Sequence, residues 1–169
     1  MKKLVFIIVL FFSFKVNAQE HEVKLDVLDL AVFKSLDITY QYIINEESAV
    51  GLSALKNLSN TDNIFNYRED FVITPFYRQY FDFSGLDNVY GEAFFAINSG
   101  RDFQDTNNDG VDETIKYTDG AFGLVVGKSY ISPRGFVLDL YAGLGRNLFE
   151  AKGSPSLVPR FGINTGFRF

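Results

Sequence analysis

The chain has 169 residues, of which 47% are hydrophobic, 17% aromatic and 22% charged, and its formal net charge is −5. This length suits one domain with a sizeable buried surface, and the composition is too apolar for a disordered chain. The absence of Cys excludes disulfide scaffolds and thiol chemistry, the single His excludes most His-based catalytic dyads and triads, and the acidic balance argues against nucleic acid as a partner.

The first residues predict a secretory signal peptide. Residues 1–3 are a short basic start, residues 4–14 are an apolar run, and residues 16–18 (Val-Asn-Ala) provide the modest side chains of a cleavage site. The apolar run is shorter than the about 20 residues of a membrane-spanning helix, which disfavours an anchor. A buried strand is the other alternative. We expect cleavage to leave a single domain over residues 19–169, outside the cytoplasm.

From Gln19 onward, apolar and polar residues alternate with the period of β-strands. In chain order, this alternation predicts eight strands, near residues 22–32, 36–44, 49–56, 71–81, 89–98, 117–130, 136–145 and 157–169. In the first strand the alternation slips at Leu28-Asp29, which we interpret as a bulge. In the fifth strand, Phe94 lies on the polar side as a misfit. No stretch has a convincing helical period.

The connections between the predicted strands alternate in length. The odd connections are residues 33–35, 57–68, 99–116 and 147–156, and the even ones are 45–48, 82–88 and 131–134. Three of the four odd connections are long, although the first is short, and every even one is short. Short turns at one end and longer loops at the other are typical of outer-membrane barrels.

Aromatic residues give an independent indication of the same architecture. Seven of them fall near the end of the short turns and in the same register: Tyr42, Tyr77, Phe81, Tyr130, Phe136, Phe167 and Phe169. A ring of outward aromatic side chains at one level is expected at a membrane interface.

The alternation alone does not say which face meets water, because a membrane barrel inverts the pattern of a soluble one. Glycines on the polar face favour a narrow polar lumen, since they make room there for long side chains but would only weaken a solvent-facing strand. They are Gly123, Gly127, Gly143, Gly145, Gly162 and Gly166. The Phe-rich apolar faces are also too bulky for the lumen of an eight-stranded barrel.

The C-terminal strand carries a further signal. Gly166, Phe167 and Phe169 form an ending that resembles the terminal-strand signal by which outer-membrane barrels are recognised for assembly. Together with the predicted signal peptide, this ending favours a membrane barrel over a soluble one.

The mature chain resembles the small outer-membrane β-barrels of the OmpA transmembrane-domain and OmpX type. It also resembles a group of secreted barrels whose fourth strand carries a Pro-x-x-Arg-x-Tyr pattern, which Pro75, Arg78 and Tyr80 match. Residues 36–42 resemble the second strand of that group, with Gln41 where an acid is more usual. The resemblance covers residues 19–169 and implies an all-β, eight-stranded, antiparallel up-and-down transmembrane barrel in the bacterial outer membrane.

The polar face holds four basic and four acidic side chains. They are Lys24, Asp26, Asp37, Arg78, Glu92, Asp139, Arg160 and Arg168. Because a buried charge is costly unless it is paired, these residues predict an internal salt-bridge network that plugs the barrel. A gated path for ions or protons is the alternative interpretation.

The longest predicted loop holds a candidate calcium site. Asp105, Asn107, Asp109 and Glu113 offer oxygen ligands at spacings similar to the start of a calcium loop. The twelfth position is Lys116, where an EF-hand needs a Glu, so an EF-hand is not expected. A Ca²⁺-ordered loop and a solvated acidic turn are both open, and no other cofactor is expected.

The sequence favours a small, monomeric, non-enzymatic barrel. The only His, His21, lies before the first predicted strand as a tail residue, where it is a poor catalytic base. We expect a structural role, or surface recognition through residues 57–68, 99–116 and 147–156. The expected partners are outer-membrane lipid, the barrel assembly machinery and an extracellular protein or surface ligand. A narrow pore and a soluble lipocalin-like carrier of a hydrophobic ligand are the alternatives.

Overall fold

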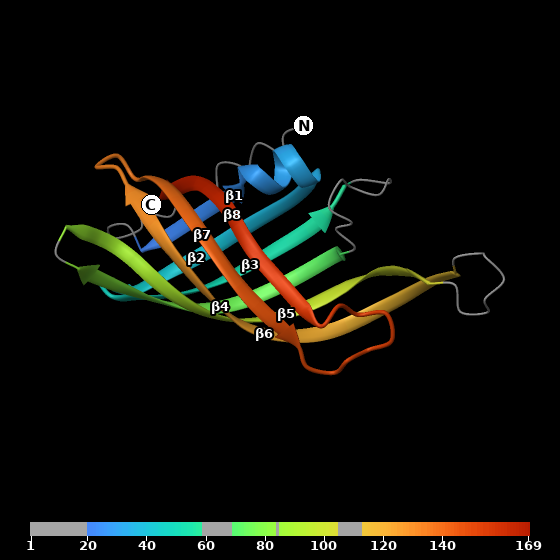
Figure 1. Cartoon of the computed structure of the whole chain (residues 1–169). Coiled ribbons are helices and arrows are strands. Elements are labelled where there is room, and N and C mark those ends of the chain that lie inside the picture. The colour runs from blue at the N-terminus through green and yellow to red at the C-terminus, as the bar shows by residue number, and fades with distance from the viewer. Residues whose placement is uncertain (1–19, 59–68, 84, 105–112) are drawn as a thin grey trace, which may run out of the picture.

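The chain folds into a closed barrel in which each strand pairs antiparallel with the next and β1 pairs with β8 (Figure 1). The structure is a computed structural model that describes residues 20–58, 69–83, 85–104 and 113–169. The strands are β1 (His21–Asp26), β2 (Ser35–Asn45), β3 (Ser48–Asn57), β4 (Glu69–Phe83), β5 (Leu86–Gln104), β6 (Glu113–Ile131), β7 (Phe136–Asn147) and β8 (Leu157–Arg168). The predicted all-β up-and-down barrel of eight strands is confirmed.

The two ends of the barrel differ. The turn end carries the β2–β3, β4–β5 and β6–β7 turns, together with the start of β1 and the end of β8. The loop end carries the other four connections. The β4–β5 turn is shorter than predicted, because β4 continues to Phe83 and β5 begins at Leu86. The predicted alternation of short turns and longer connections otherwise describes the molecule.

The predicted first strand is too long, and the bulge at Leu28-Asp29 is wrong. β1 ends at Asp26, and a single π-helical turn, η1 (Asp29–Phe33), follows it. The Asp26 carboxylate accepts hydrogen bonds from the backbone N–H groups of Leu28 and Asp29. These bonds turn the chain away from the strand direction. The slip in alternation therefore marks the end of the strand. Among the described residues, no helix is long and apolar enough to cross a bilayer.

The predicted loop over residues 99–116 is largely strand. β5 and β6 each span 19 residues, and their pairing continues from Gly100↔Tyr117 to Gln104↔Glu113. This hairpin extends beyond the other strands at the loop end (Figure 1). The prediction failed here because the backbone ladder continues after the apolar alternation has stopped.

Charged and polar side chains fill the lumen together with a cluster of buried apolar and aromatic side chains, and large apolar side chains cover the outside. Buried charged residues include Lys24, Asp26, Arg78, Glu92 and Asp139. Exposed large hydrophobic residues on the outer surface include Ile38, Leu52, Ile97, Leu124, Val126 and Phe161. This distribution is the reverse of that in a water-soluble barrel. All seven aromatic residues of the predicted ring are exposed on the outer surface, from 37% for Tyr42 to 59% for Phe167.

Glycines make room for aromatic rings in the lumen, as predicted. The Tyr90 ring occupies the space that a side chain at Gly127 would need, and the Phe94 ring does the same at Gly123 and Gly145. Phe94 is therefore no misfit, because it is one of the large side chains that fill the narrow interior.

Candidate functional site

Four strands bring their charged side chains together at the centre of the lumen. Arg78 in β4 lies directly opposite Glu92 in β5 in the strand register. Asp139 comes from β7 and Lys24 from β1. All four side chains are buried, and each lies at an inward position of its strand. The alternation of the strands therefore fixes the direction of these side chains, and closure of the barrel brings them into contact.

Seven side chains form a continuous chain of alternating charge, which we call the lumen network. In spatial order they are Arg168, Glu22, Lys24, Asp139, Arg78, Glu92 and Arg160. The distances from Lys24 Nζ to Glu22 and Asp139 are 2.9 and 2.8 Å, and Arg78 lies 2.9 Å from both Asp139 and Glu92. Each internal member contacts two opposite charges, which offsets the cost of removing it from water.

Neutral groups complete the hydrogen bonding of the lumen network. Lys24 also donates to Gln41 Oε1 at 3.0 Å, and Gln41 in turn donates to the Tyr80 hydroxyl at 2.8 Å. Ser129 Oγ donates to Asp139 Oδ1 at 2.5 Å. The Arg78 guanidinium lies 3.7 Å from the centre of the Tyr90 ring, a distance typical of a cation–π contact. The centre of the barrel is thus filled by side chains that hold one another in place.

The structure places six of the eight predicted interior charges in the lumen network. The other two, Asp26 and Asp37, make no ion pair within the described part of the chain. Asp26 instead accepts a hydrogen bond from the Tyr141 hydroxyl at 2.8 Å. It also accepts hydrogen bonds from the backbone N–H groups of Leu28 and Asp29, where η1 begins. Sequence reasoning missed Glu22, although it lies two positions before Lys24 and so on the same face of β1.

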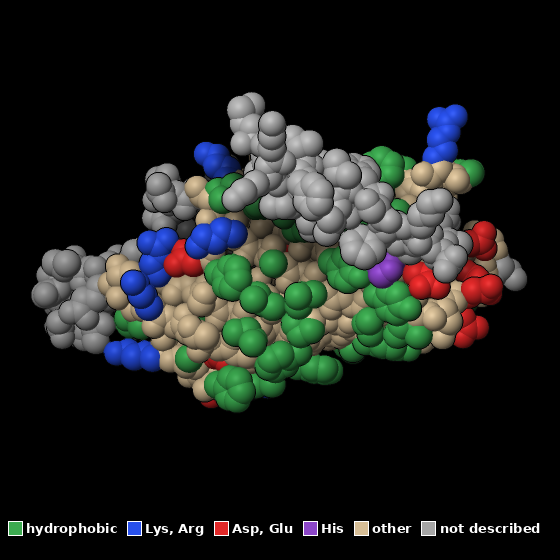
Figure 2. Space-filling model, turned by 180° about the vertical axis from the view of Figure 1, so that it is seen from behind, with side chains coloured by type: hydrophobic (Ala, Val, Ile, Leu, Met, Phe, Trp, Pro, Cys, Tyr) green, Lys and Arg blue, Asp and Glu red, His purple; other side chains and the backbone are tan. Residues whose placement is uncertain are grey.

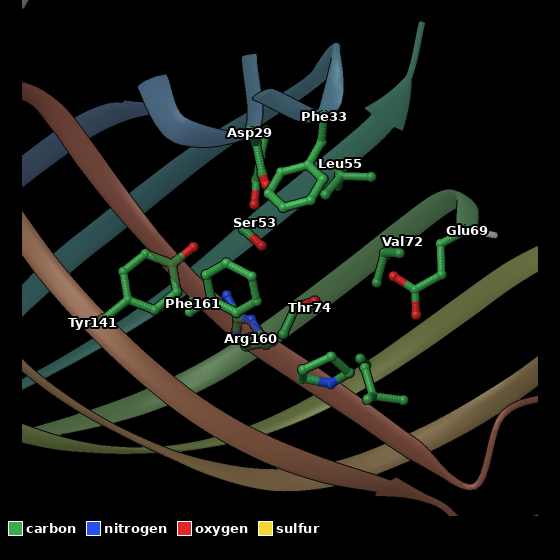
Figure 3. A pocket seen from close by; sticks show the side chains of 14 residues that line it. Asp29, Phe33, Ser53, Leu55, Glu69, Val72, Thr74, Tyr141, Arg160 and Phe161 are labelled. Atoms are coloured by element: carbon green, nitrogen blue, oxygen red, sulfur yellow. The ribbon is translucent and has the colours of Figure 1, made fainter. Parts of the chain in front are cut away.

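A cavity of about 280 Å³ lies toward the loop end, beneath η1 (Figure 3). Asp29 and Phe33 reach into it from η1, and Leu55, Val72 and Thr74 line it from the barrel wall. Asp37, Glu69 and Arg160 add charged groups. Burial, reinforced by the nearby carboxylates of Asp26 and Asp37, raises the pKa of Asp29 to about 8.

The residues of the predicted assembly signal lie at the seam between β8 and β1. Gly166 pairs with Lys24, and the backbone N–H of Phe169 donates to the His21 carbonyl at 2.8 Å. The Phe167 ring packs edge-on against Phe136 on the outer surface. His21 is the first residue of β1 rather than a tail residue, and its Nδ1 lies 2.7 Å from the Tyr40 hydroxyl.

Three of the four predicted calcium ligands, Asp105, Asn107 and Asp109, lie outside the described residues. Glu113 is the first residue of β6 and pairs with Gln104. Within the residues that the structure describes, no group of three or more His, Cys, Asp or Glu side chains could hold a metal ion.

These features define a narrow β-barrel with a charged, filled lumen and an apolar outer surface. Among solved structures, the chain is similar to the crystal structure of the N-terminal β-barrel domain of Pseudomonas aeruginosa OprF. The match has a TM-score of 0.54 and 14% sequence identity, and covers 89% of this chain and 98% of that chain. No family model and no curated protein matches the sequence. The predicted resemblance to small eight-stranded barrels is therefore confirmed at the level of fold.

Proposed function

We propose that this protein is a non-enzymatic barrel of the bacterial outer membrane whose lumen is closed to ions and whose loop end faces outward. The observation that carries the proposal is the inverted distribution of side chains. Charged residues are buried inside, while large apolar residues are exposed outside. Such an outer surface is stable in contact with the hydrocarbon of a membrane, and the pairing of β8 with β1 closes the barrel.

The ends of the apolar surface support this placement. The seven outward aromatic residues lie together at the turn end, as expected at an interface between lipid and water. At the loop end, exposed cations lie just beyond the apolar band, and Figure 2 shows Lys and Arg side chains gathered toward that end. They include Lys34, Lys56, Arg101, Lys116, Arg146 and Lys152. Such a belt suits the anionic headgroups of membrane lipid, which are therefore proposed as a partner.

The lumen network supports a closed barrel rather than a pore. An eight-stranded barrel is just wide enough for side chains to fill it, and here paired charges and aromatic rings occupy its centre. The exposed apolar outer surface disfavours a soluble lipocalin-like carrier, since such a carrier presents polar side chains to water. Recognition at the cell surface would then be carried out by the connections at the loop end, which would bind an extracellular protein or surface ligand.

Conductance across planar lipid bilayers tests the closed lumen. We expect the wild-type protein to give no steady conductance steps, because paired charges and aromatic rings occupy the centre of the lumen. A double variant, Arg78→Ala with Asp139→Ala, removes two central members and is expected to conduct. The matched control, Asp70→Ala with Arg101→Ala, removes an exposed ion pair at the loop end and is expected to stay closed. Steady steps from the wild-type protein would favour the narrow pore instead.

A further inference from the structure

The barrel wall is incomplete beside η1. β1 pairs with β8 only from Asp26↔Asn164 to Glu22↔Arg168, and with β2 only as far as Leu25↔Ile38. Toward the loop end, residues 157–163 of β8 and 35–37 of β2 therefore have no β1 residue between them. η1 occupies this interval, with its Phe33 ring 5.9 Å from the Phe161 ring. The cavity lies behind η1, so a helical turn rather than a strand covers it.

The cavity combines an apolar wall with several carboxyl groups. Phe33, Leu55, Val72, Ala96 and Val158 supply apolar surface. Three carboxylate residues also line the cavity: Asp29, Asp37 and Glu69. Among the described lining residues the one cation is Arg160, and it is already held by Glu92 at 3.2 Å. Arg160 also lies 4.8 Å from the centre of the Phe94 ring.

Asp37 is the group that points to a ligand. Its side chain is only 5% exposed and lines the cavity. Its Oδ1 atom has no hydrogen-bond partner within the described part of the chain. A buried carboxylate oxygen without a donor is costly, so a donor supplied by a ligand would be favourable. A protonated amine is such a donor, and its positive charge complements the Asp37 carboxylate.

We propose that this cavity is a binding site for a small organic cation that has an apolar body and a protonated amine. The amine contacts Asp37, and the apolar body packs against Leu55, Val72 and Phe33 beneath η1. A cavity of about 280 Å³ is at the small end of the range for ligand sites, which favours a body of one or two rings over a long acyl chain. The site depends on the cavity alone and not on where the barrel resides.

Three matched probes test the proposal: 2-naphthylmethylamine, 2-naphthylmethanol and 2-naphthoate. They share an aromatic body but carry a cationic, a neutral and an anionic head. Because the chain has no Trp, the anisotropy of naphthyl fluorescence reports binding to the full-length protein in a non-ionic detergent, with empty micelles as the baseline. We expect the wild-type protein to bind the amine roughly tenfold more tightly than either other probe, the difference that one charge-assisted hydrogen bond supplies.

Two variants locate the site. Asp37→Asn should weaken amine binding roughly tenfold while leaving the alcohol almost unchanged, since it removes the charge but keeps the shape. Val72→Phe should abolish binding of all three probes by filling the cavity. Glu46→Gln removes an equal charge at the exposed turn end and should bind like the wild type.

Equal affinity for the three probes, or unchanged amine binding in folded Asp37→Asn, would overturn the proposal. The proposal would also be overturned if the Val72→Phe variant bound the probes as tightly as the wild-type protein does. If Asp37→Asn does not fold, the preference of the wild type for the amine and its loss in Val72→Phe still decide the question.

Discussion

Arg78 and Asp139, which are 61 residues apart in the sequence, are joined by a hydrogen-bonded ion pair of 2.9 Å at the centre of the lumen. Asp139 also accepts a hydrogen bond from Lys24, and Arg78 also donates a hydrogen bond to Glu92. This pair therefore connects the two halves of the lumen network. Strands β1, β4, β5 and β7 depend on it for the pairing of their buried charges.

Removal of Arg78 should strongly destabilise the barrel. Arg78→Met leaves Glu92 with Arg160 alone and Asp139 with Lys24 alone, so part of each buried charge loses its compensation, which we expect to cost about 3–5 kcal/mol. The measurement is the urea midpoint of unfolding in detergent, followed by the loss of heat-modifiable electrophoretic mobility. Arg101→Met is the matched control, because Arg101 pairs with Asp70 while 46% exposed, and such a pair contributes less than about 1 kcal/mol. Equal losses in the two variants would contradict a central role for the Arg78–Asp139 pair.

Gly127 should tolerate no side chain. A Cβ atom there would meet both the Tyr90 ring and the Leu140 backbone carbonyl. We expect Gly127→Ala to destabilise the barrel by about 1–3 kcal/mol, the usual cost of overpacking. In Gly91→Ala the new Cβ would meet only the Phe81 ring at 3.5 Å, an ordinary contact, so this variant should be close to neutral. Denaturant unfolding of both variants measures the difference, and a neutral Gly127→Ala would show that the lumen is looser than described.

Stability should depend on pH through Asp29, which lies in η1 and outside the strands. Its pKa in the folded protein is about 8, against an ordinary value of 3.8. Desolvation by burial is the largest cause, and the carboxylates of Asp26, Asp37 and Glu69 add to it, while Arg160 opposes it. Because the folded state keeps this proton longer than the unfolded state, the contribution of Asp29 is fully favourable below about pH 4. It is lost progressively as the pH rises through about 8.

Comparison with Asp29→Asn isolates this contribution. The wild-type protein should lose stability relative to the variant as the pH rises from 4 to 8, by roughly 1.4 kcal/mol for each unit over which Asp29 holds its proton, and the difference should level off above that. Unfolding midpoints across this pH range measure it. Parallel pH profiles for the two proteins would show that Asp29 ionises normally.

The C-terminal residues should matter more for assembly in the cell than for stability. If Gly166, Phe167 and Phe169 carry the assembly signal, Phe169→Ser should lower the amount of folded barrel in cell envelopes by several-fold. Purified Phe169→Ser should still refold in detergent. Phe81→Ser is the control, since Phe81 is another outward aromatic residue of the turn end. A similar deficit in both variants would indicate lost lipid contact rather than a lost signal.

Much of the fold could be predicted because a strand has a fixed two-residue period. The alternation placed Arg78, Glu92 and Asp139 on the inner face, and the small residues at 123, 127 and 145 indicated large neighbours in the lumen. The exact partners could not be predicted. Arg78 and Glu92 face each other within one hairpin, but contact with Asp139 requires the barrel to close and the strands to adopt one particular stagger.

The cavity could not be predicted from the sequence, because the end of β1 depends on a local hydrogen-bonding pattern. Apolar residues continue after Asp26, and the slip in alternation at Leu28-Asp29 is compatible with a bulge as well as with the end of a strand. The turn depends on Asp26 accepting the backbone amides of Leu28 and Asp29, a contact that competes with strand pairing. Because β1 ends at Asp26, η1 and not a strand lies between β8 and β2 at this end, and the cavity lies behind it.

The central claim is that the barrel carries its apolar surface outward into a membrane. Electrophoresis of the washed membrane fraction, with and without boiling, tests this claim most directly. Because the pairing of β8 with β1 closes the barrel, unfolding must break a paired seam, so we expect the barrel to resist SDS until heated. We predict that the protein is found in the membrane fraction and migrates differently before and after boiling. A protein found in the soluble fraction, with one mobility under both conditions, would contradict the account.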